Sequence, residues 1–251
     1  MRNLGAALVL LAALSARAEE RSANMNLILA VDVSGSIGEP DAATNVREFS
    51  LMKEGIWTAL TDKAVGDALE QCNDRGVAVT IFEWSGTAIA TELKDVVPWT
   101  LAMNRQSLQT IADQYVSAPR SFKEGGTDVD RSLSRAHQLL DEAPMRADRN
   151  VVLVSSDGRQ NVYERGNGRN APKVVVSATR DQLLAQGATI DALVIENDEH
   201  DRRSHNDRLS DWYGKNVIGG PGAFVKPIGG FKDYSEGLRA LLLRELSRCG
   251  S

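Results

Sequence analysis

The sequence predicts an α/β protein with a single doubly wound, mostly parallel sheet of six strands, one of them an antiparallel edge strand. Two observations support this fold class. Short apolar runs such as 27–33 and 151–156 are each followed by turn residues, as in strands that are buried on both faces of a parallel sheet. Segments with apolar residues at helical spacing separate these runs, and this alternation is typical of a doubly wound fold.

Each element follows from its local pattern. Apolar runs predict strands at 27–33, 77–84, 150–156, 189–195 and 223–228. A tight turn at 85–87 predicts that 88–93 is the hairpin partner of 77–84. Helical spacing predicts helices at 42–69, 104–116, from 129 to near Pro144, from Pro172 to Gly187, and at 209–213 and 233–247. Residues 98–100 (Pro-Trp-Thr) are expected to lead into the second of these helices.

The first 18 residues are expected to be a secretory signal peptide. A short basic start precedes an apolar core at 4–14, and Ala16-Arg17-Ala18 resembles a cleavage signal. One domain is expected over 25–249, and the protein is expected to be exported to the periplasm or beyond. No other apolar run approaches the length of a membrane span.

Charge and cysteine content narrow the classes of function. The formal net charge is −5, and loss of Arg2 and Arg17 with the leader makes it −7. An acidic protein is poorly suited to nonspecific binding of nucleic acid. In an exported protein, the two cysteines, Cys72 and Cys249, favour a disulfide, and two separate buried thiols are the alternative. The sequence indicates no oligomeric state.

A polar turn directly after the first strand offers the chemistry of a metal site. Asp32, Ser34 and Ser36 alternate along this turn. In open α/β sheets, ligands bind beyond the carboxyl ends of the strands. Carboxylate and hydroxyl oxygens suit a hard cation such as Mg²⁺. The alternative is a polar turn that only caps a helix.

This D-x-S-x-S pattern resembles the first segment of the metal-ion-dependent adhesion site (MIDAS) of von Willebrand factor A (vWA) domains. That family takes a Thr and an Asp from two later loops. Thr127, which follows Gly125-Gly126, and Asp157, which follows the strand at 151–156, match them. The resemblance covers about 25–249, and the chain is similar to stand-alone exported bacterial vWA proteins of unknown function.

The resemblance implies a function. The five residues would hold Mg²⁺, with Mn²⁺ or Ca²⁺ as alternatives, and a partner protein would supply a carboxylate as the last ligand. We therefore expect an exported metal-dependent protein-binding module of the adhesion type, and no enzyme. The alternative is a metal-dependent hydrolase that uses the same cation as a Lewis acid. Against this alternative, the sequence has no G-x-S-x-G motif at Ser36, because Gly35 directly precedes the serine and does not stand two positions before it.

Several neighbouring residues have weaker support. Thr127 could serve as a helix N-cap as well as a ligand. Asp128 is expected to be structural or to lie behind the ligands. Arg159 and Asn161, beyond Asp157, are expected to be solvated loop residues or rim contacts. The loop 158–170 also carries Arg165 and Arg169, so the sequence suggests a basic rim that attracts acidic partners, with an ordinary solvated loop as the alternative.

Overall fold

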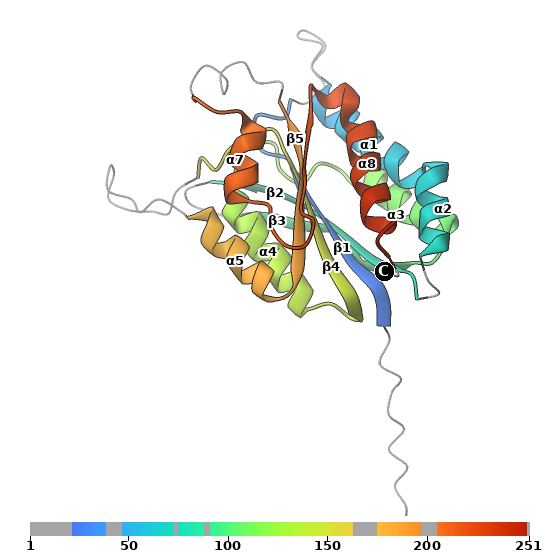
Figure 1. Ribbon diagram of the computed structural model, residues 1–251. Helices are drawn as coiled ribbons and strands as arrows, with labels where there is room; N and C mark the ends of the chain where they lie inside the picture. Colours follow the sequence, from blue (N-terminus) through green and yellow to red (C-terminus); the bar gives the residue numbers. More distant parts are fainter. Residues whose placement is uncertain are drawn as a thin grey trace, which may run out of the picture.

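Six strands form one sheet in the order β3-β2-β1-β4-β5-β6 (Figure 1). The computed structural model describes residues 22–38, 47–72, 75–87, 91–162, 175–196 and 205–249, so the predicted leader lies outside the described residues. Strand β3 is antiparallel to β2 and all other neighbours are parallel. The predicted fold class is therefore confirmed. The strands are β1 (Ser22–Asp32), β2 (Val77–Gly86), β3 (Thr91–Ala102), β4 (Arg146–Ser156), β5 (Ala188–Ile195) and β6 (Val225–Ile228).

Helices cover both faces of the sheet (Figure 1). One face carries α1 (Glu48–Thr61), α2 (Lys63–Gln71), α3 (Arg105–Ser117), the short 3₁₀ helix η2 (Phe231–Asp233) and α8 (Tyr234–Leu246). The other carries α4 (Val129–Asp141), α5 (Val176–Ala185) and α7 (Leu209–Asn216). Because successive side chains of a strand point to opposite faces, the middle of β1, residues 27–31, supplies apolar side chains to both cores. Leu27 and Leu29 join the first core, and Ile28 and Ala30 join the second.

The predicted helix at 42–69 is two helices, so the prediction of one helix is wrong. The break lies at Asp62, between α1 and α2. The Asp62 side chain accepts hydrogen bonds from the backbone N–H groups of Ala64 (2.8 Å) and Val65 (3.2 Å). It is therefore the N-cap of α2, a position that Asp favours. Residues 42–46 lie outside the described residues.

Strand β3 is longer than the predicted hairpin partner and contains residues 98–100, which we expected to lead into a helix. The pairing with β2 shifts register around Thr80: Val79 lies opposite Thr100, whereas Ile81 lies opposite Val97. Pro98 falls within this irregularity, at the edge of the sheet. A proline lacks a backbone N–H, so edge strands and bulges are where a sheet tolerates one.

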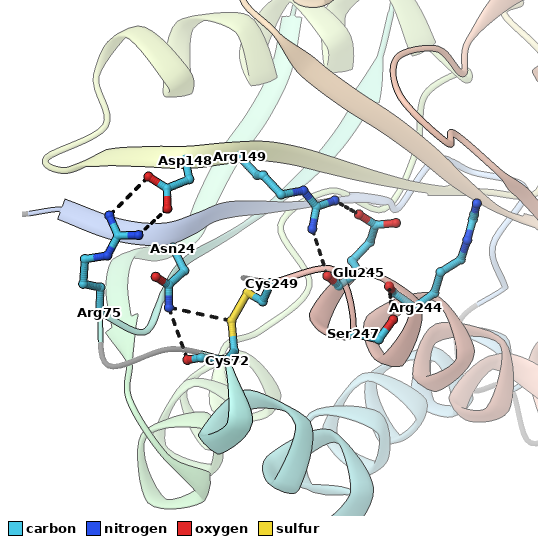
Figure 2. Close-up of a disulfide and its surroundings, with 9 residues drawn as sticks. All are labelled: Asn24, Cys72, Arg75, Asp148, Arg149, Arg244, Glu245, Ser247 and Cys249. Carbon is cyan, nitrogen blue, oxygen red and sulfur yellow. Dashed lines mark hydrogen bonds and ion pairs between the residues drawn. A yellow bond between two sulfur atoms is a disulfide. The ribbon is translucent and has the colours of Figure 1, made fainter. Parts of the chain in front are cut away.

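The predicted disulfide between Cys72 and Cys249 is confirmed, with a Cα–Cα distance of 5.1 Å (Figure 2). Asn24, near the start of β1, donates to the carbonyl of Cys72 (3.2 Å). The bridge therefore lies where β1 begins, at the pole opposite the carboxyl ends of the parallel strands. Nearby, Arg149 of β4 forms an ion pair with the buried carboxylate of Glu245 and donates to its carbonyl (2.9 Å), so the end of α8 is also tied to the sheet.

None of the helices in the described ranges combines the length and the apolar character that a membrane span requires.

Candidate functional site

Three loops meet at the carboxyl ends of β1, β2 and β4. We call them loop 1 (32–37), loop 2 (118–127) and loop 3 (157–162). Loop 1 follows β1, loop 3 follows β4, and loop 2 runs from α3 to α4. Because β1 and β4 are parallel neighbours, the ends that carry Asp32 and Asp157 lie side by side. Loop 2 joins them through a two-residue bridge, in which the Gly86 N–H donates to the Gly126 carbonyl (3.0 Å) and the Gly126 N–H donates back (2.5 Å).

The structure brings all five predicted site residues together. The hydroxyl oxygens of Ser34 and Ser36 are 3.1 Å apart, and the Ser34 hydroxyl is 3.5 Å from that of Thr127. Ser36 donates its hydroxyl proton to Asp157 Oδ1 (2.8 Å). Asp32 Oδ1 accepts from the backbone N–H of Ser34 (2.8 Å). Residues separated by up to 125 positions therefore form one cluster of oxygens.

The spacing of this cluster fits a hard divalent cation. Oxygens at neighbouring corners of an octahedron lie about 3.0 Å apart around Mg²⁺ and about 3.4 Å apart around the larger Ca²⁺, given their usual metal–oxygen distances. The separations within the cluster run from 2.8 to 3.5 Å. The donors are two carboxylates and three hydroxyls, all of them oxygen ligands. Across the described residues, no group of three or more His, Cys, Asp or Glu side chains is placed to hold a metal ion.

The two carboxylates are buried close to each other. Asp32 is 0% exposed and Asp157 is 6% exposed. Burial raises the pKa of Asp32 to about 6, although hydrogen bonds from Ser156 and Ser34 oppose the shift. Burial, and next to it the charge of Asp32, raises the pKa of Asp157 to about 7. Because both groups are costly to ionise in this setting, a cation that replaced their protons would stabilise the charged forms.

Ser156 is a site residue that the sequence reasoning missed. Its hydroxyl donates to Asp32 Oδ2 (2.5 Å), so both carboxylate oxygens of Asp32 are held in place. The signal was present, since Ser156 directly precedes Asp157 at the end of a predicted strand. Behind it, the buried hydroxyl of Tyr213 donates to the carbonyl of Gly158 (3.0 Å) and fixes the start of loop 3.

Glycines allow loop 2 to approach the other loops closely. Gly125 has a φ of 111°, in the region that residues with a Cβ rarely adopt, and its carbonyl accepts from the N–H of Gly35 (2.9 Å). At Gly158, an added Cβ would lie 2.5 Å from the hydroxyl oxygen of Thr127. The contact between loops 2 and 3 therefore depends on the absence of a side chain there.

The N-cap of α4 is Asp128 and not Thr127. Asp128 Oδ1 accepts from the N–H of Arg131 (3.4 Å), which leaves the Thr127 hydroxyl directed toward Ser34. Asp128 also accepts from the Gln160 side chain (3.0 Å). Its role is structural as expected, and burial raises its pKa.

Two loop 3 residues differ from the expectation of solvated or rim positions. Asn161 Oδ1 accepts from the Thr127 N–H (2.8 Å), and the Asn161 N–H donates to the Thr127 carbonyl (3.0 Å), so Asn161 holds loop 2 in register. The Arg159 side chain is 9% exposed and forms an ion pair with Asp207 (2.9 Å). The suggestion of a basic rim is therefore wrong for Arg159, and Arg165 and Arg169 lie outside the described residues.

Comparison of the sequence with known families finds a match to DUF1194, described as a protein of unknown function, over residues 22–250. The chain belongs to the DUF1194 family. No curated protein matches it in sequence. Solved structures, by contrast, share the fold of this DUF1194 chain.

Three similar structures illustrate the resemblance. Proximal thread matrix protein 1 from the mussel byssus, solved with a zinc-occupied MIDAS motif, has a TM-score of 0.57 and 15% identity over 91% of this chain. A von Willebrand factor type A protein from Catenulispora acidiphila has a TM-score of 0.51 and 18% identity over 90%. The PilB minor pilin from Streptococcus sanguinis has a TM-score of 0.62 and 10% identity over 91%.

These similarities show that the DUF1194 chain has a vWA-like fold. The matched region spans 49% of the mussel protein, 43% of the Catenulispora protein and 62% of the pilin. The chain therefore corresponds to about half of the length of these larger proteins.

Proposed function

We propose that this chain is an exported metal-dependent protein-binding module of the adhesion type. In the proposal, Asp32, Ser34, Ser36, Thr127 and Asp157 hold a divalent cation, and a carboxylate from a partner protein completes its coordination. The convergence of five oxygen-bearing side chains from three loops carries this proposal: four have oxygens 2.8 to 3.5 Å apart, and Asp32 joins them through the N–H of Ser34. The zinc-occupied MIDAS motif of the mussel protein, which has a similar fold, gives further support.

The donor set favours Mg²⁺, with Mn²⁺ and Ca²⁺ as alternatives, because hydroxyl oxygens suit a small hard cation. Two carboxylates balance the charge of a divalent cation, and the three hydroxyls add no negative charge. The bound cation therefore supplies a positive centre that attracts a further anionic ligand. Ser36 and Gly35 are exposed whereas the other four proposed ligands are buried, so a partner would approach over loop 1.

The surrounding residues fix the ligands in advance. Ser156 and the Ser34 N–H orient the two oxygens of Asp32, and Asn161 holds the backbone at Thr127. Such a prearranged site has little ordering entropy left to lose when the cation binds. The disulfide between Cys72 and Cys249 agrees with an exported protein, because disulfides persist in oxidising compartments.

Calorimetric titration of the metal-stripped protein with Mg²⁺ and Mn²⁺ tests the proposed site. We expect one saturable binding event in the wild type, and none in Asp32→Ala or Asp157→Ala. Asp148→Ala is the matched control, because Asp148 is an exposed carboxylate of β4 that pairs with Arg75 near the disulfide. Equal binding by the wild type and both site variants would remove the proposed metal site.

A second experiment tests the proposed role in protein binding. Immobilised wild type, loaded with Mg²⁺, is titrated with short peptides that carry a single Asp or Glu, and with the matching Asn or Gln peptides. We expect binding of the acidic peptides only, and its loss when EDTA removes the cation. Turnover of p-nitrophenyl acetate or phosphate with Mg²⁺, lost in Asp32→Ala, would favour the hydrolase alternative instead.

A further inference from the structure

Arg120, in loop 2, reaches across to the backbone of loop 1. Its Nη2 donates to the carbonyl of Val33 (2.8 Å) and to the carbonyl of Ser34 (2.9 Å). These two carbonyls lie between the proposed ligands Asp32 and Ser36. Arg120 is 86 positions away from Ser34 in the sequence, and no motif in the sequence pointed to it.

Arg120 is itself held by the elements behind the site. The N–H of the next residue, Ser121, donates to Glu83 Oε2 (2.8 Å), and the Tyr115 hydroxyl donates to Glu83 Oε1 (3.1 Å). Glu83 is a buried residue of β2, with 1% of its surface exposed. The guanidinium group also lies over the ring of Phe49 in α1, with 5.1 Å between its carbon and the ring centroid. Three elements therefore fix the position from which Arg120 donates.

The two carbonyls belong to consecutive peptide planes, and the opposite side of each plane makes a contact within the site. A peptide group is planar, so the direction of its C=O also sets the direction of its N–H. The plane with the Val33 carbonyl contains the Ser34 N–H, which donates to Asp32 Oδ1 (2.8 Å). The plane with the Ser34 carbonyl contains the Gly35 N–H, which donates to Gly125 (2.9 Å). A rotation of either peptide plane would turn the Ser34 side chain and weaken the hydrogen bond that holds Asp32.

We infer that Arg120 is a positioning residue of the metal site, which clamps the two peptide planes on either side of Ser34 so that Asp32, Ser34 and Ser36 meet at one point. This inference rests on the proposed function. Contacts from a second layer of residues commonly decide how tightly a metal site binds, and their loss typically weakens metal affinity by about 10- to 100-fold.

A purely electrostatic role for Arg120 predicts the opposite result. A positive charge beside the carboxylates repels a cation, so its removal alone would strengthen metal binding. Loss of the clamp would weaken binding. The sign of the change in affinity therefore separates the two roles.

The experiment compares Arg120→Met and Arg120→Lys with the wild type. Methionine keeps an apolar stem over Phe49 but donates no hydrogen bond, whereas lysine keeps the charge and three N–H donors. We expect Arg120→Met to bind Mg²⁺ and Mn²⁺ about 10- to 100-fold more weakly, and Arg120→Lys to recover most of the affinity. Arg105→Met is the control, because Arg105 pairs with Asp67 on the exposed face of α2 and α3.

Hydrogen exchange of the metal-free proteins gives a readout that does not depend on metal binding. We expect peptides covering 33–37 to exchange faster in Arg120→Met than in the wild type, and peptides from β5 to be unchanged. Unchanged or tighter metal binding by a folded Arg120→Met overturns the inference. If Arg120→Met does not fold, Arg120→Ala decides, because alanine also lacks the hydrogen-bond donor: wild-type exchange over 33–37 together with wild-type affinity would overturn the inference.

The proposed metal site and the role of Arg120 can be refuted separately. A wild type that binds no metal removes the proposed function, and the exchange experiment then still tests whether Arg120 orders loop 1. A wild type that binds metal, with an equally tight Arg120→Met, removes only the role of Arg120.

Discussion

The two buried carboxylates of the site should make the metal-free protein less stable as the pH rises from about 4 to about 7. In the unfolded chain, both groups titrate near their ordinary pKa of 3.8, whereas in the folded protein the pKa of Asp32 is about 6 and that of Asp157 is about 7. Between these values the folded state binds more protons than the unfolded state. The free energy of unfolding therefore falls as the pH rises, and it levels off above pH 7.

The size of this effect follows from the pKa values. One pKa unit corresponds to about 1.4 kcal/mol, which gives about 3 kcal/mol for Asp32 and about 4 kcal/mol for Asp157. The repulsion between the two carboxylates enters only the figure for Asp157, so the two figures add to a total of at most about 7 kcal/mol. For a domain of this size, such a loss is a large part of the whole free energy of unfolding.

Urea unfolding in EDTA at pH 4.5 and pH 8 measures the effect. We expect Asp157→Asn, which removes one carboxylate and its repulsion of the other, to lose about 3–4 kcal/mol less than the wild type between these two pH values. Asp148→Asn is the exposed control. The buried Asp191, whose pKa is raised to about 6 mainly by burial and then by Glu245, is present in every variant and cancels in the comparison.

Metal binding should reverse the trend, because a cation that binds only the folded state stabilises it in proportion to the logarithm of its concentration. Saturating Mg²⁺ at pH 8 should therefore restore stability to the wild type and not to Asp157→Asn. The same pH dependence of stability in the wild type and Asp157→Asn, both without metal, would refute the view that burial raises the pKa of the site carboxylates.

Two further predictions concern the disulfide and the contact between loops 2 and 3. Reduction of the bridge between Cys72 and Cys249, which closes a segment of 177 positions, should lower the free energy of unfolding by up to about 5 kcal/mol in urea titrations; a double Cys→Ser variant that does not respond to dithiothreitol is the control. Gly158→Ala, whose added Cβ would lie 2.5 Å from the Thr127 hydroxyl oxygen, should weaken Mg²⁺ binding at least about 10-fold by calorimetry. Gly214→Ala, where a Cβ meets no atom within 4 Å, should bind like the wild type.

The sequence predicted the sheet well because its central strands are buried on both faces. Such strands are mostly apolar, and β1 and β4 carry uninterrupted apolar runs at 27–31 and 151–154, ahead of Asp32 and Asp157. The end of each run also marks the carboxyl edge of the sheet, where the candidate site lies. Local composition was therefore sufficient to predict that these two acids lie at neighbouring positions.

Features that depend on exceptions or on distant contacts were harder to predict. Residues 98–100 were expected to lead into a helix, yet Pro98 lies at an irregularity within an edge strand. Asp62 divides the helix predicted at 42–69 into two, because its side chain caps the second one. Arg120 acts through hydrogen bonds to two backbone carbonyls of loop 1, and Tyr213 through one to a carbonyl of loop 3, both far away in the sequence. No periodicity or motif records such contacts.

The disulfide also determines how this domain would carry a mechanical load. Asn24, near the start of β1, lies against the bridge between Cys72 and Cys249, so the two ends of the folded domain are neighbours. Under tension applied between these ends, the covalent bond shields the 177 positions from Cys72 to Cys249. Only the segment from Ser22 to Cys72 can unfold and extend, to a length of about 170 Å when fully stretched. The domain would therefore act as a tether of limited length, because the residues enclosed by the disulfide bear no tension even after β1 leaves its central place in the sheet.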